Sequence, residues 1–188
     1  MNEAHLQFCS SDDWRSMIEH DVMPVVVGEL DLGDDVLEIG PGPGFTTDVL
    51  RRSVPRLTAV ELDPVLATRL AERLIGTNVD VIRGDATDTH LAADRFSAAT
   101  SFNMLHHVPT RELQNAIFAE LHRVLRPGGL LVAADGVYDE ATVAFHEGDI
   151  YNPIDPAELE SRLSTAGFRD IEIGRFVFGW MCRARAAA

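Results

Sequence analysis

Short apolar runs rich in β-branched residues alternate along the chain with longer amphipathic segments. This alternation is typical of repeated β-α units, and it predicts a mostly parallel sheet covered by helices. The predicted strands are Asp35 to Gly40, Leu57 to Glu61, Val79 to Arg83, Phe96 to Phe102, Leu130 to Asp135, Asp170 to Gly174 and Phe176 to Ala184. We therefore expect an α/β fold.

Two helices have clear signals at both of their ends. The first is expected over Arg111 to Leu125, after Thr110 as N-cap and before Arg126-Pro127-Gly128-Gly129, where proline cannot continue a helix. The second is expected from Asp155-Pro156-Ala157-Glu158, which combines an N-cap with a proline at the first position, to a stop at Gly167. The first helix has apolar positions at three- and four-residue spacing that predict a core-facing stripe, namely Leu113, Ile117, Leu121 and Val124.

The two ends of the chain add a hairpin and a cover. The last two predicted strands are separated by only a residue or two at Gly174-Arg175, which is too short for a crossover helix, so they must pair antiparallel. Near the start, Ser10-Ser11-Asp12-Asp13 predicts the cap of a helix that carries Trp14, Met17 and Ile18. This helix precedes the first strand and is expected to cover part of the sheet.

Length and charge restrict the class of protein. The chain has 188 residues, which is enough for one domain of ordinary size. Lysine and arginine number 16 against 30 aspartate and glutamate residues, which gives a formal net charge of -14. An acidic surface repels phosphate backbones, so nucleic acid is a disfavoured partner.

The termini and the cysteines bear on the compartment. No basic segment followed by an apolar run opens the chain, and no apolar stretch approaches the roughly 20 residues that span a bilayer. Cys9 and Cys182 are the only thiols and lie far apart in sequence, so we expect inert core thiols in a reducing, cytoplasmic location with no membrane partner. The tail from Ala186 to Ala188 is expected to fray.

The segment Val36 to Thr47, VLEIGPGPGFTT, is the most informative, because a strand is followed by three alternating glycines and then by a helix. Such a loop holds a ligand through its main chain, at the end of the sheet where open α/β folds bind ligands. The spacing is G-x-G-x-G rather than the G-x-G-x-x-G of dinucleotide-binding enzymes, and no Gly-Lys-Ser/Thr is present. Glu38 precedes the loop and no basic residue follows until Arg51, so the local field favours a cationic ligand group such as an ammonium.

Acidic residues also follow the next two strands. Glu61 ends the second strand, where a carboxylate can accept both hydroxyls of a ribose. Asp85 follows the third strand, where it can accept a proton of an adenine amino group. Their occurrence at successive strand ends favours one nucleoside site over two unrelated loop acids.

At this point the sequence resembles the class I S-adenosylmethionine-dependent methyltransferases. The resemblance runs from about Asp31 to the C-terminus and rests on the ordered motifs VLEIGPGPG, VELDP, RGDA, FSAATSFNMLHHV and LHRVLRPGGLLVAADG. It implies a three-layer, Rossmann-like methyltransferase fold with a seven-stranded, mostly parallel sheet and an antiparallel last strand. We expect a single methyltransferase domain over residues 1–188, with residues 1–30 as an N-terminal helical cover and residues 31–188 as the core.

The same resemblance assigns roles around the cofactor, S-adenosyl-L-methionine, whose product is S-adenosyl-L-homocysteine. Gly40, Gly42 and Gly44 are implied to wrap the methionine part, and Asn103 to lie beside the reacting methyl group. Glu61 and Asp85 are implied to contact ribose and adenine. The expected cofactor-binding residues are Glu38, Gly40, Pro41, Gly42, Gly44, Thr46, Glu61, Leu62, Gly84, Asp85, Ala86 and Asn103.

The methyl acceptor is read from a second set of motifs. The stretches LEIGPGPGFTT and LTAVELDPVLATRL look like the rRNA adenine dimethylases, but that family follows its fourth strand with an Asn-Leu-Pro-Tyr type motif, and Ser101 to His106 holds no Pro-Tyr pair. SFNMLHHV and LHRVLRPGG resemble the small-molecule methyltransferases instead. We expect transfer to a small molecule by in-line displacement. The alternatives are a nucleic-acid methyltransferase, a catalytically silent S-adenosylmethionine-binding module and, disfavoured by the loop, a dinucleotide oxidoreductase.

Histidines are the candidate catalytic residues. His106 and His107 follow the fourth strand and are expected to act as a base or to position the acceptor. His5 and His146 are second-rank candidates, because the N-terminal cover and the segment Phe145 to Asn152 are free to close over the site. No metal site is expected, since His146-Glu147-Gly148-Asp149 reads as a solvated loop. Four aromatic residues are expected to line an apolar acceptor pocket, namely Phe8, Trp14, Tyr138 and Tyr151.

Overall fold

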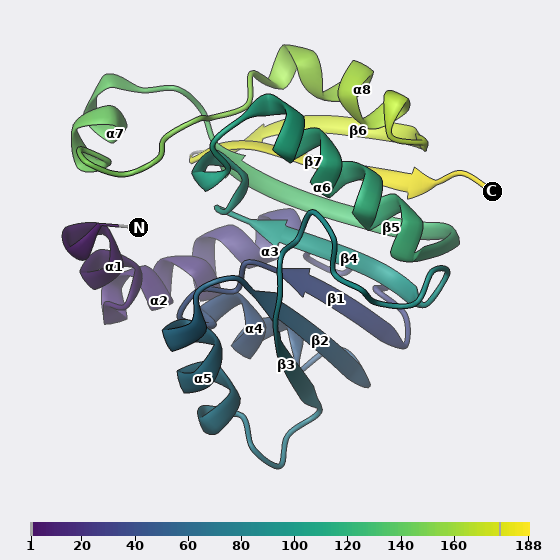
Figure 1. Cartoon of the computed structure of the whole chain (residues 1–188), viewed down its shortest axis with the longest axis horizontal. Helices are drawn as coiled ribbons and strands as arrows, with labels where there is room; N and C mark the ends of the chain where they lie inside the picture. The colour runs from purple at the N-terminus through teal and green to yellow at the C-terminus, as the bar shows by residue number, and fades with distance from the viewer. Residues whose placement is uncertain (1, 177) are drawn as a thin grey trace.

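A seven-stranded sheet runs through the computed structural model, which describes residues 2–176 and 178–188 (Figure 1). The strands are β1 (Asp35–Ile39), β2 (Arg56–Glu61), β3 (Val79–Arg83), β4 (Phe96–Phe102), β5 (Leu125–Gly136), β6 (Phe168–Phe176) and β7 (Gly179–Ala186). Their order across the sheet is β3-β2-β1-β4-β5-β7-β6. The expected α/β class and mixed sheet are confirmed.

The strand directions create a ligand crevice. Strands β1 to β5 are parallel, whereas β7 pairs antiparallel with both β5 and β6. The chain moves outward from β1 through β2 to β3 and then returns to place β4 on the other side of β1. Because the connections after β1 and β4 leave in opposite directions, a crevice opens at the carboxyl ends of these two strands.

Two apolar layers pack against opposite faces of the sheet. Side chains alternate along each strand, so Leu131 and Ala133 of β5 join one cluster while Val132 and Ala134 join the other. The helices around the sheet are α3 (Met23–Val26), α4 (Phe45–Leu50), α5 (Pro64–Arg73), α6 (Arg111–Val124), α7 (Glu140–Phe145) and α8 (Pro156–Thr165). Helices α6 and α8 belong to the first cluster, and α3 and α4 to the second, which gives the expected three layers.

The helix caps read from the sequence are present. Thr110 Oγ1 accepts from Leu113 N at the start of α6, and Asp155 Oδ1 accepts from Ala157 N at the start of α8. Satisfying these otherwise free amide groups fixes where each helix begins. Helix α8 ends just before Gly167, as expected, because this glycine has a φ of 99° that does not continue a helix.

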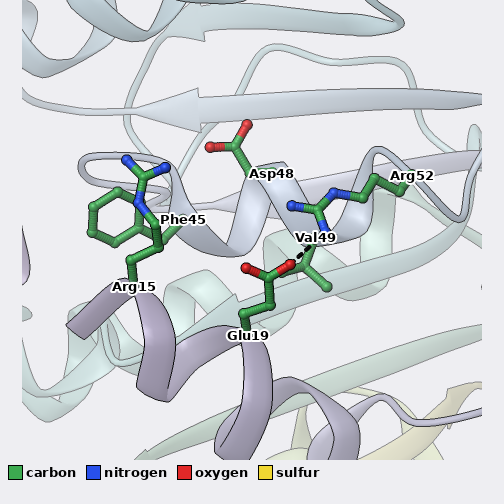
Figure 2. Close-up of a pocket in the computed structure, with 6 residues that line it drawn as sticks. All are labelled: Arg15, Glu19, Phe45, Asp48, Val49 and Arg52. Carbon is green, nitrogen blue, oxygen red and sulfur yellow. Dashed lines mark hydrogen bonds and ion pairs between the residues drawn. The ribbon is translucent and has the colours of Figure 1, made fainter. Parts of the chain in front are cut away.

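Residues before β1 form a helical cover, which consists of α1 (Glu3–Cys9), α2 (Asp12–Met17), the π-helix η1 (Ile18–Val22) and α3. Figure 2 shows how the cover contacts α4 and the turn after it: Glu19 forms an ion pair with Arg52 of the turn at 2.5 Å, and the Arg15 guanidinium lies 4.5 Å from the centre of the Phe45 ring. The hollow between them measures only about 30 Å³. The far end of the cover, α1, lies with α7 at the end of the sheet toward which the parallel strands point (Figure 1).

Several predicted boundaries are wrong. The final hairpin reverses between Phe176 and Gly179 rather than at Gly174-Arg175, because β6 continues to Phe176 before the chain turns. Val177, placed in the last predicted strand, lies outside the described residues. The segment Arg126-Pro127-Gly128-Gly129 does end α6, but it already belongs to β5, whose irregular start pairs with β4.

Two expectations about burial also fail. Leu113 is 39% exposed, because it lies in the first turn of α6 and faces a cavity rather than the core. Ala186 does not fray: it is the last residue of β7, pairs with Phe168 and is 1% exposed. Within the described residues, no helix combines the length and the apolar run that crossing a bilayer needs.

Candidate functional site

A cavity of about 1280 Å³ opens at the carboxyl ends of the parallel strands. Its strand-end half is formed by the loop after β1 and by the residues that end β2, β3 and β4. Its cover half is formed by α1, α2, α7 and the loop that follows α7. Both halves are parts of one continuous hollow, so two ligands bound there would meet.

The glycine loop supplies bare main chain to the strand-end half. Gly40, Gly42 and Gly44 have φ angles of 63°, 55° and 88°, which only glycine adopts without strain. A Cβ atom at Gly40 would lie 2.1 Å from Met104 Cγ, whereas one at Gly42 would meet nothing within 4 Å. Gly40, Pro41 and Gly42 all line the cavity, with open space beside Gly42. Gly44 does not, because it begins α4 and packs against Leu70 of α5.

Glu38 lies beneath the loop and outside the cavity lining, together with Thr46. Its carboxylate accepts hydrogen bonds from the hydroxyl groups of Thr46 and Thr47, the latter at 2.6 Å. Burial raises the pKa of Glu38 to about 7, against the effect of the two hydroxyl donors. Glu38 and Thr46 thus fix the turn from β1 into α4, and the expected direct contact of Glu38 with a ligand is not formed by this arrangement.

Glu61 is the buried acidic group on the cavity wall. One carboxylate oxygen accepts from Gly42 N and the other from Asp63 N, each at 2.9 Å. These bonds fix the side chain against the loop. Each oxygen of a carboxylate has two lone-pair sites, so one site on each remains for a pair of ligand hydroxyls.

The ends of β3 and β4 complete the strand-end half. Gly84, Asp85 and Ala86 line it after β3, and Asp85 is exposed with Oδ1 accepting from Thr87 N and Thr87 Oγ1. Leu62 lies on the wall beside Glu61 and is 65% exposed. Asn103 follows β4 with a φ of 50°, and its N–H donates to Ala134 O, which fixes this strained residue where the two halves meet.

Four histidines gather in the cover half. His5 comes from α1, His106 and His107 from the 3₁₀ helix η2 (Leu105–His107), and His146 from the loop after α7. Their ring centres lie between 4.1 and 6.3 Å apart. One ring nitrogen from each lies within 4.8 Å of the others, so we call these four residues the histidine cluster.

Two aspartates support the histidine cluster. Asp135, at the end of β5, accepts from His106 N at 3.1 Å, from the His106 Nδ1–H and from Gly136 N at 2.7 Å. Asp149 Oδ2 lies 3.7 Å from His5 Nδ1 and 3.9 Å from His107 Nδ1, and it accepts from Asn2 N at 2.9 Å. The sequence analysis missed Asp135, although an acidic residue at the carboxyl end of the fifth strand was a signal for it.

The surroundings lower the pKa of three of the four imidazoles and raise that of the fourth. Burial, together with the positive charge of neighbouring histidines, lowers the pKa of His107 to about 3 and that of His5 to about 4. Burial also lowers the pKa of His146. Burial acts in the same direction on His106, but the facing Asp135 carboxylate outweighs it and raises the pKa. At neutral pH His5, His107 and His146 therefore carry free nitrogen lone pairs.

The predicted aromatic lining is partly correct. Phe8, Trp14 and Tyr151 line the cover half, whereas Tyr138 is 69% exposed and lies outside it. Cys9 also lines this half, and burial raises the pKa of its thiol to about 12, as it does for buried Cys182. Both thiols are free.

Known proteins match the chain over its core. The methyltransferase domain family matches residues 37–133, which is more than half of the chain. A protein-L-isoaspartate O-methyltransferase from Nitrobacter winogradskyi is 37% identical over 120 residues, and a ribosomal RNA small subunit methyltransferase A from Deinococcus radiodurans is 49% identical over 61 residues. These matches cover 61% and 32% of this chain, but only 51% and 21% of the two relatives. The chain thus spans about half the length, or less, of the curated relatives it matches.

The fold is also found among solved structures. A phosphoethanolamine N-methyltransferase 2 from Haemonchus contortus, solved in complex with phosphomonomethylethanolamine and S-adenosylhomocysteine, superposes with a TM-score of 0.71 at 15% identity. The superposition covers 95% of this chain and 53% of that chain. The resemblance seen in the sequence is confirmed, because the solved structures with this fold include S-adenosylmethionine-dependent methyltransferases. The chain belongs to the methyltransferase domain family.

Proposed function

We propose that the protein transfers a methyl group from S-adenosylmethionine to a small-molecule acceptor, as one domain in which residues 1–30 cover a core of residues 31–188. The observation that carries the proposal is the Glu61 carboxylate, fixed on the cavity wall by Gly42 N and Asp63 N with acceptor capacity to spare. The proposed compartment is the cytoplasm, which the free thiols of Cys9 and Cys182 support.

The strand-end half has the chemistry that S-adenosylmethionine requires. Glu61 offers two lone-pair sites to the ribose hydroxyls, and exposed Asp85 offers an acceptor to the adenine amino group. At Gly42 the space that a Cβ atom would fill is open, so main chain can approach the amino-acid part of the cofactor. Pro41, Leu62, Gly84 and Ala86 give this half its remaining walls. Glu38, Gly44 and Thr46 act indirectly, by setting the shape of the loop.

The protein contributes alignment rather than reactivity. When bound, S-adenosylmethionine supplies a methyl group already activated on a positively charged sulfur. Placing two reactants in line can supply several kcal/mol of the barrier (about 7 or more in the best intramolecular cases). Asn103, at the boundary of the two halves, and His106 and His107, just beyond it, are the residues placed to align the acceptor.

A small acceptor fits the cover half. This half lies under α1 and α7 and is lined by Phe8, Trp14 and Tyr151, which give it apolar walls suited to a small molecule. The net charge of -14 opposes docking of a polyanion. The Haemonchus contortus structure supports the proposal, because a protein of the same fold was solved in complex with the small molecule phosphomonomethylethanolamine. His106 and His107 are assigned to positioning that acceptor, and Asp135 fixes the ring of His106.

Calorimetric titration with S-adenosylhomocysteine tests the cofactor site. The wild-type protein is expected to bind it, and Glu61→Ala to weaken binding about 100-fold, since two hydrogen bonds to a charged group are lost. Glu72→Ala removes an exposed carboxylate of α5 and is the matched control, with unchanged affinity. A wild-type protein that binds neither S-adenosylmethionine nor S-adenosylhomocysteine refutes the proposal.

Transfer of a radiolabelled methyl group to a fractionated cell extract tests the acceptor class. Label is expected in the fraction that passes an ultrafiltration membrane. Label that is retained and released by ribonuclease would support a nucleic-acid acceptor, the reading favoured by the Deinococcus radiodurans relative. Label released by protease would support a protein acceptor, as the name of the Nitrobacter winogradskyi relative implies for that protein. Binding without any transfer identifies a silent binding module.

A further inference from the structure

We propose that the histidine cluster, His5, His106, His107 and His146, binds one divalent transition-metal ion of the Zn²⁺ class. The sequence analysis expected no metal site, because it considered only the segment His146 to Asp149 and interpreted that segment as a solvated loop. The structure brings one ring nitrogen from each to within 4.8 Å of the others. His5, His106 and His146 are buried, and His107 is partly buried.

The hydrogen bonds of two rings orient them as metal-bound histidines are usually oriented. Nδ1 of His106 bonds to Asp135, and Nδ1 of His146 bonds to Thr142 O at 2.7 Å. A metal-ligating histidine almost always uses one ring nitrogen in this way, which fixes the tautomer and leaves the other nitrogen as ligand. Nε2 of both rings is therefore the nitrogen left for an ion, which at His106 would displace the proton that the Asp135 carboxylate favours.

Three buried nitrogens of the cluster have no hydrogen-bond partner among the described residues: His5 Nδ1, His107 Nδ1 and His146 Nε2. The nearest carboxylate oxygen, Asp149 Oδ2, is 3.7 Å from the first and 3.9 Å from the second, beyond hydrogen-bond distance. A buried polar atom without a partner costs roughly 1–3 kcal/mol. Three such atoms in one cluster of imidazoles offer lone pairs that a metal ion can accept.

The donor set selects the kind of ion. Imidazole nitrogens suit Zn²⁺, Cu²⁺, Ni²⁺ and Fe²⁺, whereas Mg²⁺ and Ca²⁺ prefer oxygen ligands. In a tetrahedral zinc site with Zn–N of about 2.0–2.1 Å, ligand nitrogens lie about 3.4 Å apart. The observed limit of 4.8 Å therefore requires the rings to move inward by roughly 1 Å, which side-chain rotation provides. Asp149 adds a negative charge beside the ion.

The ligands come from three separate parts of the chain, so the ion would join them. His5 belongs to the cover, His106 and His107 follow β4 of the core, and His146 follows α7. Two of these three parts, the cover and the segment around α7, are already joined by Asn2, whose N–H donates to Asp149 and whose side chain donates to Phe145 O and Glu147 O. A bound ion would thus close the cover half. If the proposed methyl transfer is correct, the acceptor meets this ion at His106 and His107; metal binding itself does not depend on that reaction.

Metal binding is tested on protein without a histidine tag, stripped with a chelator and titrated with Zn²⁺ and with Co²⁺. We expect one ion per chain, with visible absorption bands of nitrogen-ligated Co²⁺. Combining His5→Ala with His146→Ala is expected to raise the Kd at least about 100-fold. The control combines His20→Ala with His90→Ala, two exposed histidines outside the cluster, and retains wild-type affinity.

A second measurement follows the cover. Zn²⁺ is expected to slow amide hydrogen exchange in residues 2–9 and 140–151 of the wild-type protein, but not of the His5→Ala, His146→Ala variant. S-adenosylhomocysteine binding, measured on the same samples, reports whether each variant is folded and whether the proposed function holds. Wild-type protein that binds no more Zn²⁺ than this variant overturns the metal site. Zn²⁺ binding without S-adenosylhomocysteine binding would instead overturn only the proposed function.

Discussion

In the strand-end half of the cavity, the ligand-facing groups lie at the ends of β1, β2, β3 and β4, which are neighbours in the sheet. In the cover half, the imidazoles come from α1, η2 and the loop after α7, segments that share no sheet register. The first half is fixed by short bonds between adjacent loops, such as Glu61 to Gly42 N. The second depends on contacts over long sequence separations, such as Asn2 N to Asp149. The strand-end half should therefore survive changes that disorder the cover half.

The largest expected effect comes from Asp135→Ala. The buried carboxylate accepts three hydrogen bonds, two of them from His106, and its removal leaves these donors unpaired. Breaking a buried charged pair typically costs about 3–5 kcal/mol of unfolding free energy. Urea unfolding measures this loss, and Asp80→Ala, which removes an exposed carboxylate of β3, should stay within about 0.5 kcal/mol of wild type.

The same variant tests whether the two halves are independent. Below its unfolding temperature, Asp135→Ala should bind S-adenosylhomocysteine with wild-type affinity, because the ends of β1, β2 and β3 are untouched. An affinity loss as large as that of Glu61→Ala would mean that the halves form one cooperative unit, and the contrast between them would be wrong.

The next effect is a pH dependence that originates beneath the glycine loop. Burial raises the pKa of Glu38 from 4.5 to about 7, so the folded protein binds a proton that the unfolded chain releases. The unfolding free energy should therefore fall as pH rises from about 4.5 to 7, by about 3 kcal/mol. Subtracting the pH profile of Glu38→Gln from that of the wild type isolates this contribution. A difference that is flat over this range would contradict the assignment.

The smallest effect separates strain from ligand contact in the loop. Gly42→Ala and Gly76→Ala each place a side chain on backbone with positive φ, at 55° and 79°, in open space. Both should lose about 1 kcal/mol of stability, the usual cost of a left-handed residue. Only Gly42→Ala should also weaken S-adenosylhomocysteine binding, by about five- to tenfold, since its Cβ points into the cavity. If the two variants bound S-adenosylhomocysteine with equal affinity, the loop would not be part of the binding site.

Local sequence determined most of the fold. The alternation of apolar runs and amphipathic segments located every strand of the sheet, and Thr110 and Asp155 located the starts of α6 and α8. The errors lie where local signals compete with tertiary pairing. The hairpin turn was placed at Gly174-Arg175 because these residues separate two apolar runs, yet pairing with β7 continues β6 to Phe176.

The site divides in the same way. Gly42, Glu61 and Asp85 line the cavity, and their positions at strand ends could be predicted from one segment at a time. Glu38 was predicted to bind the cofactor and lies beneath the loop, since sequence spacing cannot tell whether a side chain points above or below a loop. Asp135 was missed because its role depends on a hydrogen bond to His106, which follows the neighbouring strand β4 and lies 29 residues away in the chain. Leu113 was assigned to the core, although its helix turns it into the cavity.

The sequence by itself determined the parallel sheet, its antiparallel edge, the glycine loop and the acidic strand ends, because each depends on residues close together in the chain and on regular periodicity. Only the tertiary structure decided that His5, His106, His107 and His146 meet, and that Asp135 and Asp149 support them. Their separations in the chain carry no periodic signal. They become neighbours because the cover and the loop after α7 pack over the carboxyl end of the sheet, and such packing depends on the whole fold.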